Sequence, residues 1–291
     1  MAPRLKKALG QHHLVDGQLC RPLVDFLAPA GRRVIEIGPG GGVLTDELLA
    51  AGAKVVAWEV DPEWAFTLAS RPSHEGGHGG PPLRRDSAFT HLPVSRPTSV
   101  SAEPNLHLVV GDALDIPWER LPLGTLAAGN LPYNVGTVIL RDLLSRGLGV
   151  ERAAFLVQKE VADRLVAQPG DSAYGALSVL VAARTTAAFL GRVRAGSFRP
   201  PPKVDGGLVG LIRHPPPLPE SQMANFEATV FAAFAKRRKT LRNSLGATWG
   251  RDVAEARLRA AGIAPDQRAE RLGVAEFAAL SFCTLTLPFL R

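Results

Sequence analysis

The sequence predicts an α/β protein: one open, largely parallel sheet of seven strands, followed by a small α-helical region. Three observations carry this prediction. Short apolar segments alternate with stretches of helical periodicity, as in sheets whose strands are joined by helices. A glycine-rich loop separates the first strand from the next helix, and beyond the proline-rich segment 214–219 only helical patterns follow. We therefore expect one domain over 1–214 and a second over 215–291.

The composition limits the class of protein. A chain of 291 residues with 46% hydrophobic and 21% charged residues is typical of a soluble globular protein. No apolar segment reaches the ~18 residues of a membrane span, and the N-terminus lacks the apolar part of a secretory signal. Cys20 and Cys283 are far apart and favour reduced thiols, so we expect a cytoplasmic protein without a membrane partner. The net charge of +7 favours a polyanionic partner, nucleic acid before membrane.

The N-terminal part predicts a ligand site at a glycine loop. Residues 4–14 form a basic arm, which either covers a ligand or is a frayed end. Helical spacing follows from Asp16 to Leu27. A buried strand at 34–38 then leads into Pro39-Gly40-Gly41-Gly42 and a helix over 43–51. Backbone N–H groups and a positive helix end favour an anionic or nucleotide-like ligand, although the spacing is not that of a dinucleotide motif.

Acidic residues follow the next two predicted strands. Strand 54–60 carries Glu59 near its end, where a carboxylate can accept from both hydroxyls of a ribose. Strand 106–110 leads to Asp112, which either accepts from the amine of a base or caps a turn. Residues 71–104, between them, are rich in Pro, Gly, Ser, His and Arg and predict a surface insertion. Their histidines lack the spacing of a metal site, and we expect no metal.

The chain is organised around Asn130-Leu131-Pro132-Tyr133, directly after the buried strand 125–129. Ligands of open α/β sheets bind at this carboxyl edge. The Asn130 amide oxygen and a backbone carbonyl held by Pro132 can accept from an exocyclic amine, and Tyr133 can stack on the base. The alternative is an ordinary turn, with the Asn capping the next helix and the Tyr in the core.

The rest of the first domain completes the seven strands. We expect helices at 135–145, 158–167 and 176–183, and strands at 152–157, 185–193 and 206–213. Three prolines stiffen the loop 197–204 before the last strand and hold Phe198 near the same sheet edge. Phe198 is either a second ring for a base, opposite Tyr133, or a core anchor for the loop.

The second domain has a basic cluster. Residues 222–248 and 251–261 have helical patterns, and five cations lie inside the first stretch. Such a cluster suits a phosphate backbone, and a solvated basic face is the alternative. The five are Lys236, Arg237, Arg238, Lys239 and Arg242.

Together these motifs make the chain resemble the KsgA-type ribosomal RNA adenine dimethyltransferases, a Rossmann-like family that uses S-adenosylmethionine. The resemblance covers most of residues 4–275 apart from the insertion. Its motifs are Gly-Gln-x-x-Leu, EIGPG, Glu59, Gly111-Asp112-Ala113, NLPYN, QKEVADRL, YGALS, FRPPPKVD and KRRKTLRNSL.

The resemblance implies the roles of the site residues. It implies S-adenosylmethionine contacts at His12, Leu14, Gly38, Gly40, Glu59, Asp112 and Asn130, and a target adenine between Tyr133 and Phe198. It also implies that the helical domain binds RNA. The family usually has Asn-Phe where this chain has His12-His13, which changes both the amide contact to the cofactor and the aromatic packing.

We therefore expect direct methyl transfer to the N6 amine of adenines in small-subunit (16S) rRNA, by a monomer acting on an immature ribosomal particle. Asn130 and the Leu131 carbonyl would orient the amine of a base lifted from its stack. The alternatives are an Erm-type methyltransferase of large-subunit rRNA, a DNA adenine methyltransferase, and a non-catalytic ribosome-assembly or transcription factor. The motifs QKEVADRL and YGALS favour the small-subunit enzyme over the Erm-type enzyme. The lack of an obvious DNA-recognition domain disfavours a DNA adenine methyltransferase. A protein that only binds has no need of Glu59, Asp112 and NLPY together.

Overall fold

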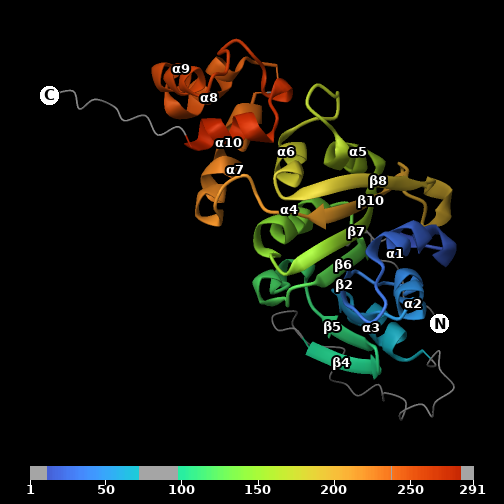
Figure 1. Ribbon diagram of the computed structural model, residues 1–291. Helices are drawn as coiled ribbons and strands as arrows, with labels where there is room; N and C mark the ends of the chain where they lie inside the picture. The colour runs from blue at the N-terminus through green and yellow to red at the C-terminus, as the bar shows by residue number, and fades with distance from the viewer. Residues whose placement is uncertain (1–11, 72–97, 237, 283–291) are drawn as a thin grey trace. The chain divides into compact units, whose positions relative to one another are not determined.

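The computed structural model describes residues 12–71, 98–236 and 238–282, and these form two compact units (Figure 1). The first unit holds the described residues up to Ala162 together with Ala188–Ile212. The second holds Asp163–Ala187 and the described residues from Arg213 onward. The predicted domain boundary at residue 214 lies next to Arg213, where the chain passes from the first unit to the second for the last time. Residues 163–187, which the sequence analysis assigns to the first domain, instead group with the second unit.

The first unit is built on an eight-stranded sheet of order β4-β5-β3-β2-β6-β7-β10-β8. Its strands are β2 (Arg33–Ile37), β3 (Lys54–Glu59), β4 (Thr98–Glu103), β5 (Leu106–Val110), β6 (Thr125–Asn130), β7 (Val150–Gln158), β8 (Thr185–Val193) and β10 (Gly206–Arg213). The predicted α/β class is confirmed. The number of strands is one more than predicted, because the last residues of the insertion form β4, which pairs antiparallel with β5.

The order of the strands reverses at β2. This strand pairs in parallel with β3 on one side and with β6 on the other, so the chain builds outward to β5 and then returns to β6 and β7. At such a reversal the loops after the two central strands separate and leave a crevice at their carboxyl ends. The loops after β2 and β6 are the glycine loop and the Asn130 turn.

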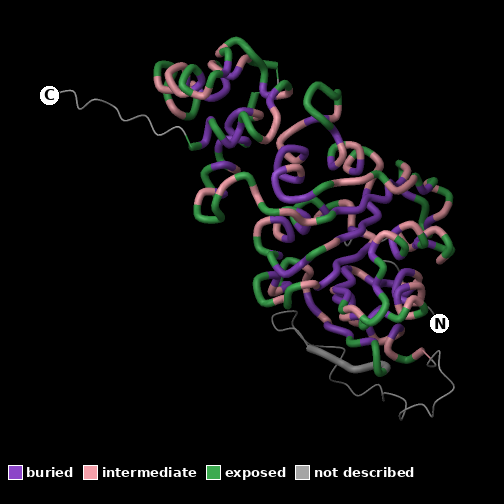
Figure 2. The backbone as a smooth tube through the Cα atoms, in the orientation of Figure 1, coloured by how far each residue is buried: buried purple, intermediate pink, exposed green. Residues whose placement is uncertain are grey.

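Helices and apolar strand residues enclose the core of the first unit. The helices are α1 (Arg21–Leu27), α2 (Val43–Ala50), α3 (Pro62–Ala69) and α4 (Gly136–Arg146). Strand β6 is buried along 125–129, as expected for a parallel strand covered on both faces. Figure 2 shows the buried backbone running along the central strands.

A two-stranded sheet joins two segments that are far apart in the sequence. Strand β1 (His13–Leu14) pairs antiparallel with β9 (Phe198–Arg199), with Leu14 opposite Phe198. The Val15 N–H adds a 3.2 Å hydrogen bond to the Ser197 carbonyl. This pairing fixes the chain around His12 and His13 against the proline-rich loop.

The second unit is helical and has its own core. It contains α6 (Ala176–Ala182), α7 (Glu220–Phe234), α8 (Leu241–Trp249), α9 (Arg251–Ala260) and α10 (Val274–Phe282), and α5 (Lys159–Val166) leads into it. Phe226, Leu258 and Phe277 are fully buried at its centre. The buried Arg184 donates both terminal nitrogens to Glu220, at 2.7 and 3.0 Å.

The predicted helix over 222–248 is interrupted. Helix α7 ends at Phe234 and α8 begins at Leu241, so the basic cluster lies mainly on the turn between them. Thr240, with extended backbone angles, is the N-cap residue of α8. The turn is closed by the Lys239 N–H, which donates to the Lys236 carbonyl at 2.9 Å. The hydrophobic periodicity of the sequence did not predict this break, because the apolar residues on either side of the cations keep the same helical spacing.

Several predictions fall on residues outside the described ones: the N-terminal arm up to Gln11, the histidines of the insertion, Arg237 and Cys283. Among the described residues, no helix combines the length and apolar character needed to cross a bilayer. No group of three or more His, Cys, Asp or Glu side chains in the described ranges is arranged to hold a metal ion.

Candidate active site

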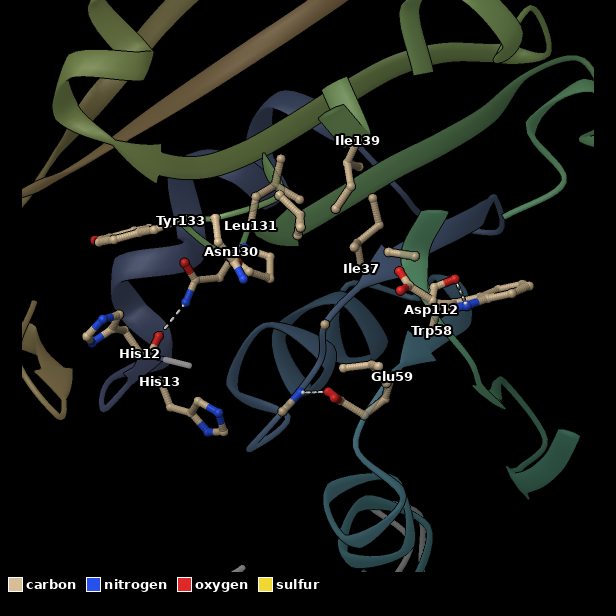
Figure 3. A pocket seen from close by; sticks show the side chains of 17 residues that line it. His12, His13, Ile37, Trp58, Glu59, Asp112, Asn130, Leu131, Tyr133 and Ile139 are labelled. Carbon is tan, nitrogen blue, oxygen red and sulfur yellow. Dashed lines mark hydrogen bonds between the residues drawn. The ribbon is translucent and has the colours of Figure 1, made fainter. Parts of the chain in front are cut away.

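A cavity of about 220 Å³ lies at the carboxyl ends of the central strands (Figure 3). Its walls come from the segment before β1, the glycine loop, and the ends of β3, β5 and β6. Nine of the residues predicted for the site line it: His12, Gly38, Gly40, Glu59, Asp112, Asn130, Leu131, Pro132 and Tyr133. Leu14 and Phe198 are not among the lining residues.

The glycine loop needs its glycines for two different reasons. Gly38 and Gly40 have φ values of +65° and +48°, a region that side chains with a Cβ rarely adopt. A Cβ on Gly38 would meet nothing within 4 Å, so this glycine keeps open space where it lines the cavity. A Cβ on Gly40 would come within 2.7 Å of the His13 ring. The backbone here is therefore exposed to a ligand on one side and packed under a histidine on the other.

Glu59 ends β3 with its carboxylate in the wall of the cavity. Its Oε2 accepts from the Gly40 N–H at 3.0 Å, and its Oε1 accepts from the Asp61 N–H at 2.9 Å. The side chain is buried, and burial raises the pKa of the carboxyl while the backbone N–H bonds oppose the rise. Each oxygen has a second lone pair, so Glu59 can still accept from ligand hydroxyls.

Asp112 has a structural role as well as a place in the cavity. Its Oδ1 accepts from the Leu114 N–H at 2.9 Å and so caps the short 3₁₀ turn that follows, which is the alternative noted from the sequence. Its backbone carbonyl accepts from the Trp58 indole N–H at 2.9 Å. Trp58, which the sequence analysis did not single out, thereby fixes this corner of the cavity, and its only signal was its place next to Glu59.

Asn130 is oriented by the N-terminal segment. Its Nδ2 donates to the His12 carbonyl at 2.7 Å. Because a carbonyl oxygen can only accept, the amide nitrogen must face His12, and Oδ1 lies on the side of the Tyr133 ring (Figure 3). The fixed orientation thus presents an acceptor, and not a donor, to a ligand.

The residues after Asn130 form a rigid turn. The Leu131 N–H donates to the Leu156 carbonyl at 2.9 Å, which continues the strand pairing. The Pro132 carbonyl accepts from the Gly136 N–H at 2.8 Å and so begins α4. The Tyr133 ring lies 5.2 Å from the His12 ring, centroid to centroid, with a tilt of 33°. Partial burial raises the pKa of the Tyr133 phenol.

Phe198 does not face the cavity. Its side chain is 1% exposed and packs in the core with Leu14, Leu156 and Leu208. Of the two interpretations from the sequence, the structure has the core anchor of the proline loop. Pairing with β1 explains this outcome, because Phe198 stands opposite the equally buried Leu14. Leu14 borders a smaller neighbouring cavity of about 30 Å³ beside the glycine loop.

The two histidines point to different parts of the site. His12 Nδ1 donates to the Pro200 carbonyl at 2.8 Å. His13 Nδ1 instead accepts from the Gly41 N–H at 3.2 Å, and its ring lies 4.4 Å from that of Trp64. The sequence shows that both residues replace the usual Asn-Phe, but it indicates no role for His13. The alternation of side chains along an extended segment could have predicted that His12 and His13 point in different directions.

The basic residues of the second unit are only partly alike. Lys236, Arg238 and Lys239 are exposed on the turn between α7 and α8. Arg242, in the first turn of α8, is half-buried and pairs with Glu255 at 3.4 Å. Because Arg238 lies on the turn and Arg242 lies in α8, the two side chains do not share one face of a helix.

Comparison with known proteins decides the family. The family model for ribosomal RNA adenine dimethylase matches residues 2–78 and 95–283, nearly the whole chain outside the insertion. The chain belongs to the ribosomal RNA adenine dimethylase family. The ribosomal RNA small subunit methyltransferase A of Kineococcus radiotolerans is 38% identical over 96% of this chain and 85% of its own length. That of Caulobacter vibrioides is 38% identical over 96% of this chain and 97% of its own length.

Solved structures support the assignment at the level of the fold. A dimethyladenosine transferase from Plasmodium falciparum has a TM-score of 0.72 and 22% identity, covering 92% of this chain and 96% of its own. The 23S rRNA methyltransferase ErmE has a TM-score of 0.63 and 24% identity, covering 92% and 98%. The predicted family, its Rossmann-like methyltransferase fold with a helical C-terminal part, and its enzyme class are confirmed for this dimethylase.

Proposed function

We propose that this dimethylase transfers methyl groups from S-adenosylmethionine to the N6 amine of adenines in small-subunit rRNA. The observation that carries the proposal is the orientation of the Asn130 amide. The His12 carbonyl holds its nitrogen, so its oxygen is presented as an acceptor at the cavity that Glu59 and the glycine loop also line.

The residues of the cavity fit S-adenosylmethionine. Gly38 leaves space that a side chain would fill, which suits close approach of a ligand to the backbone. Glu59 supplies acceptors for ribose hydroxyls, and Asp112 keeps Oδ2 beyond its capping bond to accept from an adenine amine. The apolar part of the lining, Ile37, Leu131, Val135 and Ile139, suits the faces of a purine.

The protein's contribution to the reaction is orientation. Bound S-adenosylmethionine would supply an electrophilic methyl group. The lone pair of an adenine amine is delocalised into the ring, and bonds from its two N–H groups to Asn130 Oδ1 and the Leu131 carbonyl would localise it on nitrogen. Tyr133 would stack on the base after it leaves its RNA stack. Because Phe198 is buried, we assign the stacking to Tyr133 without that second ring.

The choice of small-subunit rRNA rests on the relatives. The curated relatives at 35–38% identity carry the name ribosomal RNA small subunit methyltransferase A. The likeness to ErmE concerns the fold alone. We further propose that the enzyme acts as a cytoplasmic monomer on an immature ribosomal particle, and that Lys236, Arg238 and Lys239 contact its phosphates. For Arg237 the same role rests on its place in the sequence alone.

Transfer of labelled methyl groups tests this proposal. Immature small subunits, naked small-subunit rRNA and large subunits are incubated with the enzyme and labelled S-adenosylmethionine. Labelling of the immature small subunits above the other two is the expected result. Preferential labelling of large subunits would replace the proposal with the Erm-type activity. No labelling of any RNA, with binding intact, would indicate a non-catalytic assembly factor.

A further inference from the structure

The side chains of His12 and His13 divide between the two halves of the proposed site. The His12 ring contacts Tyr133 and the Pro200 carbonyl, and its backbone carbonyl accepts from Asn130, so His12 belongs to the base side of the cavity and the proline loop. The partners of His13 are Gly41 and Trp64, at the glycine loop and the helix beside it. Figure 3 shows the two rings diverging from neighbouring positions of the chain.

We propose that His13 is a positioning residue for the methyl donor: in its neutral form it holds the glycine loop in the binding conformation, and its protonation releases the loop and weakens cofactor binding. The inference rests on the proposed function, because it takes the glycine loop as the cofactor site. It concerns a position where this chain departs from the usual Phe of the family it resembles, since a phenyl ring cannot accept a hydrogen bond.

The geometry restricts the ring to one protonation state. Gly41 N–H is a donor, so His13 Nδ1 must carry a lone pair and the proton must reside on Nε2. The ring also packs against Gly40, where any Cβ would overlap it, so the contact involves backbone on two successive residues. A protonated ring would place an N–H against the Gly41 N–H, and the loop or the ring must then move.

The charges around His13 act in both directions. Asp61 at the start of α3 favours the protonated ring, whereas burial and the neighbouring His12 oppose it, and burial prevails, so the pKa of His13 is below its usual value of 6.5. Glu59 accepts from the Gly40 and Asp61 N–H groups, one on each carboxylate oxygen. On the other side of the loop, Arg71 donates to the Gly41 carbonyl and pairs with Asp46 at 3.0 Å. His13 is thus neutral at neutral pH.

The protonation state of His13 determines the direction in which pH changes the affinity for the cofactor. If the cofactor binds the form with neutral His13, affinity is complete above the pKa of His13 in the free enzyme and falls as the pH drops through it. A single proton can change the affinity by at most about tenfold per pH unit below the pKa. The sulfonium charge of the ligand would act in the same direction by repelling the imidazolium.

Calorimetric titration with S-adenosylmethionine tests the proposal without RNA. We compare the wild type with His13→Asn, whose amide oxygen can replace Nδ1 as a non-titrating acceptor, and with His13→Phe, which keeps a ring and removes the acceptor. Near neutral pH we expect His13→Asn to bind nearly as well as wild type and His13→Phe to bind about three- to tenfold more weakly. As the pH falls from about 7.5 to the lowest value at which both proteins stay folded, the wild type should lose affinity that His13→Asn keeps, and the difference should grow by up to about tenfold per pH unit below the pKa of His13.

His12→Asn is the matched control, because it removes the neighbouring imidazole and restores the usual family residue. It should keep the additional loss of affinity at low pH, with the loss beginning at a higher pH than in wild type because His12 no longer opposes protonation of His13. Nitrogen-15 NMR of the cofactor-free enzyme gives a second readout: the His13 ring should carry its proton on Nε2, and the Gly41 amide resonance should shift with the protonation of that ring.

The outcomes separate the two proposals. Equal pH dependence in wild type and His13→Asn, or a His13 ring protonated on Nδ1 at neutral pH, would overturn the role of His13 while leaving the methyl donor site intact. Absence of S-adenosylmethionine binding in the wild type at neutral pH would overturn the cofactor assignment itself, and with it this inference.

Discussion

Individual side chains at the sheet edge have separable functions. Glu59 is engaged with the backbone of the glycine loop and also lines the cavity, whereas Asn130 is held by one partner and offers one free direction. A change at Glu59 should therefore affect binding of the methyl donor, and a change at Asn130 should affect the chemical step.

Glu59→Ala should weaken binding of S-adenosylmethionine about tenfold to a hundredfold, because two bonds from ribose hydroxyls to a carboxylate are lost. The loss applies to the ground state and the transition state alike, so KM should rise more than kcat falls. Calorimetry and steady-state kinetics measure the two effects. Glu63→Ala, an exposed carboxylate in the first turn of α3, is the control. Unchanged affinity in Glu59→Ala would make Glu59 a structural residue only.

Glu36 should make the stability of the first unit depend on pH. Its carboxyl is buried in β2, accepts from the Thr45 hydroxyl at 2.7 Å, and burial raises its pKa to about 8. A raised carboxyl pKa means that the folded state keeps a proton that the unfolded state loses, so stability declines as the pH rises from about 4.5 toward 8. Glu36→Gln should remove on the order of 2 kcal/mol of this decline between pH 6 and pH 8, measured by urea unfolding. Identical slopes for the two proteins would show that Glu36 ionises normally.

The residue roles were only partly predictable. Asn130, Glu59 and the glycines could be placed from the sequence because parallel strands bring their carboxyl ends to one edge. The orientation of the Asn130 amide could not, because it depends on the carbonyl of a residue 118 positions away. Phe198 was ambiguous for the same reason: its burial is decided by pairing with β1, which no local pattern reveals.

At the scale of elements, the turn between α7 and α8 is the main candidate for RNA contact. Replacing Lys236, Arg238 and Lys239 with Gln should weaken binding to small-subunit rRNA and reduce the salt dependence by about two to three units of slope. Cofactor affinity should not change. Arg242 is excluded from the set because it already pairs with Glu255.

Filter binding at several salt concentrations measures this slope. Arg251→Gln, an exposed cation at the start of α9, serves as the matched control and should leave the slope unchanged, well within the change of about 0.7 to 0.9 units that the loss of one phosphate contact causes. If the triple variant keeps the wild-type slope, the turn is a solvated basic surface and the RNA contact lies elsewhere.

Elements with strong periodicity were predicted best, and breaks between them worst. The seven predicted strands of the main sheet and the helices α1, α2 and α4 appear near their expected positions, because apolar periodicity reports burial directly. The division of 222–248 into two helices and the strand β4 were missed. The start of α8 depends on a partner distant in sequence, because the Leu241 N–H bonds to the Gln267 carbonyl. Strand β4 instead pairs with the next strand of the chain, β5, and its mostly polar sequence carries no apolar signal.

At the scale of the whole molecule, the insertion at 71–104 contains two parts with different expected contributions to stability. The family model passes over residues 79–94, whereas Thr98–Glu103 form an edge strand of the sheet. Deleting 79–94 should change the melting temperature by no more than about 3 °C, and deleting 98–103 should lower it further because β5 keeps β3 but loses its second partner, β4.

Differential scanning calorimetry of the two deletions measures this difference. A similar loss for both would show that residues 79–94 contribute to the fold as much as the strand does. Methyl donor binding should survive deletion of 79–94, since the deletion removes none of the described residues that line the cavity.

The central claim is that the cavity at Asn130 methylates the N6 amine of adenine, and nucleoside analysis of the product tests it most directly. Immature small subunits treated with wild-type enzyme and S-adenosylmethionine should yield N6,N6-dimethyladenosine by mass spectrometry after digestion. Asn130→Ala should fold and bind the cofactor about as well, yet form the product at least about a hundredfold more slowly in a single turnover. Methylation at another atom or base, or full activity in Asn130→Ala, would contradict the account.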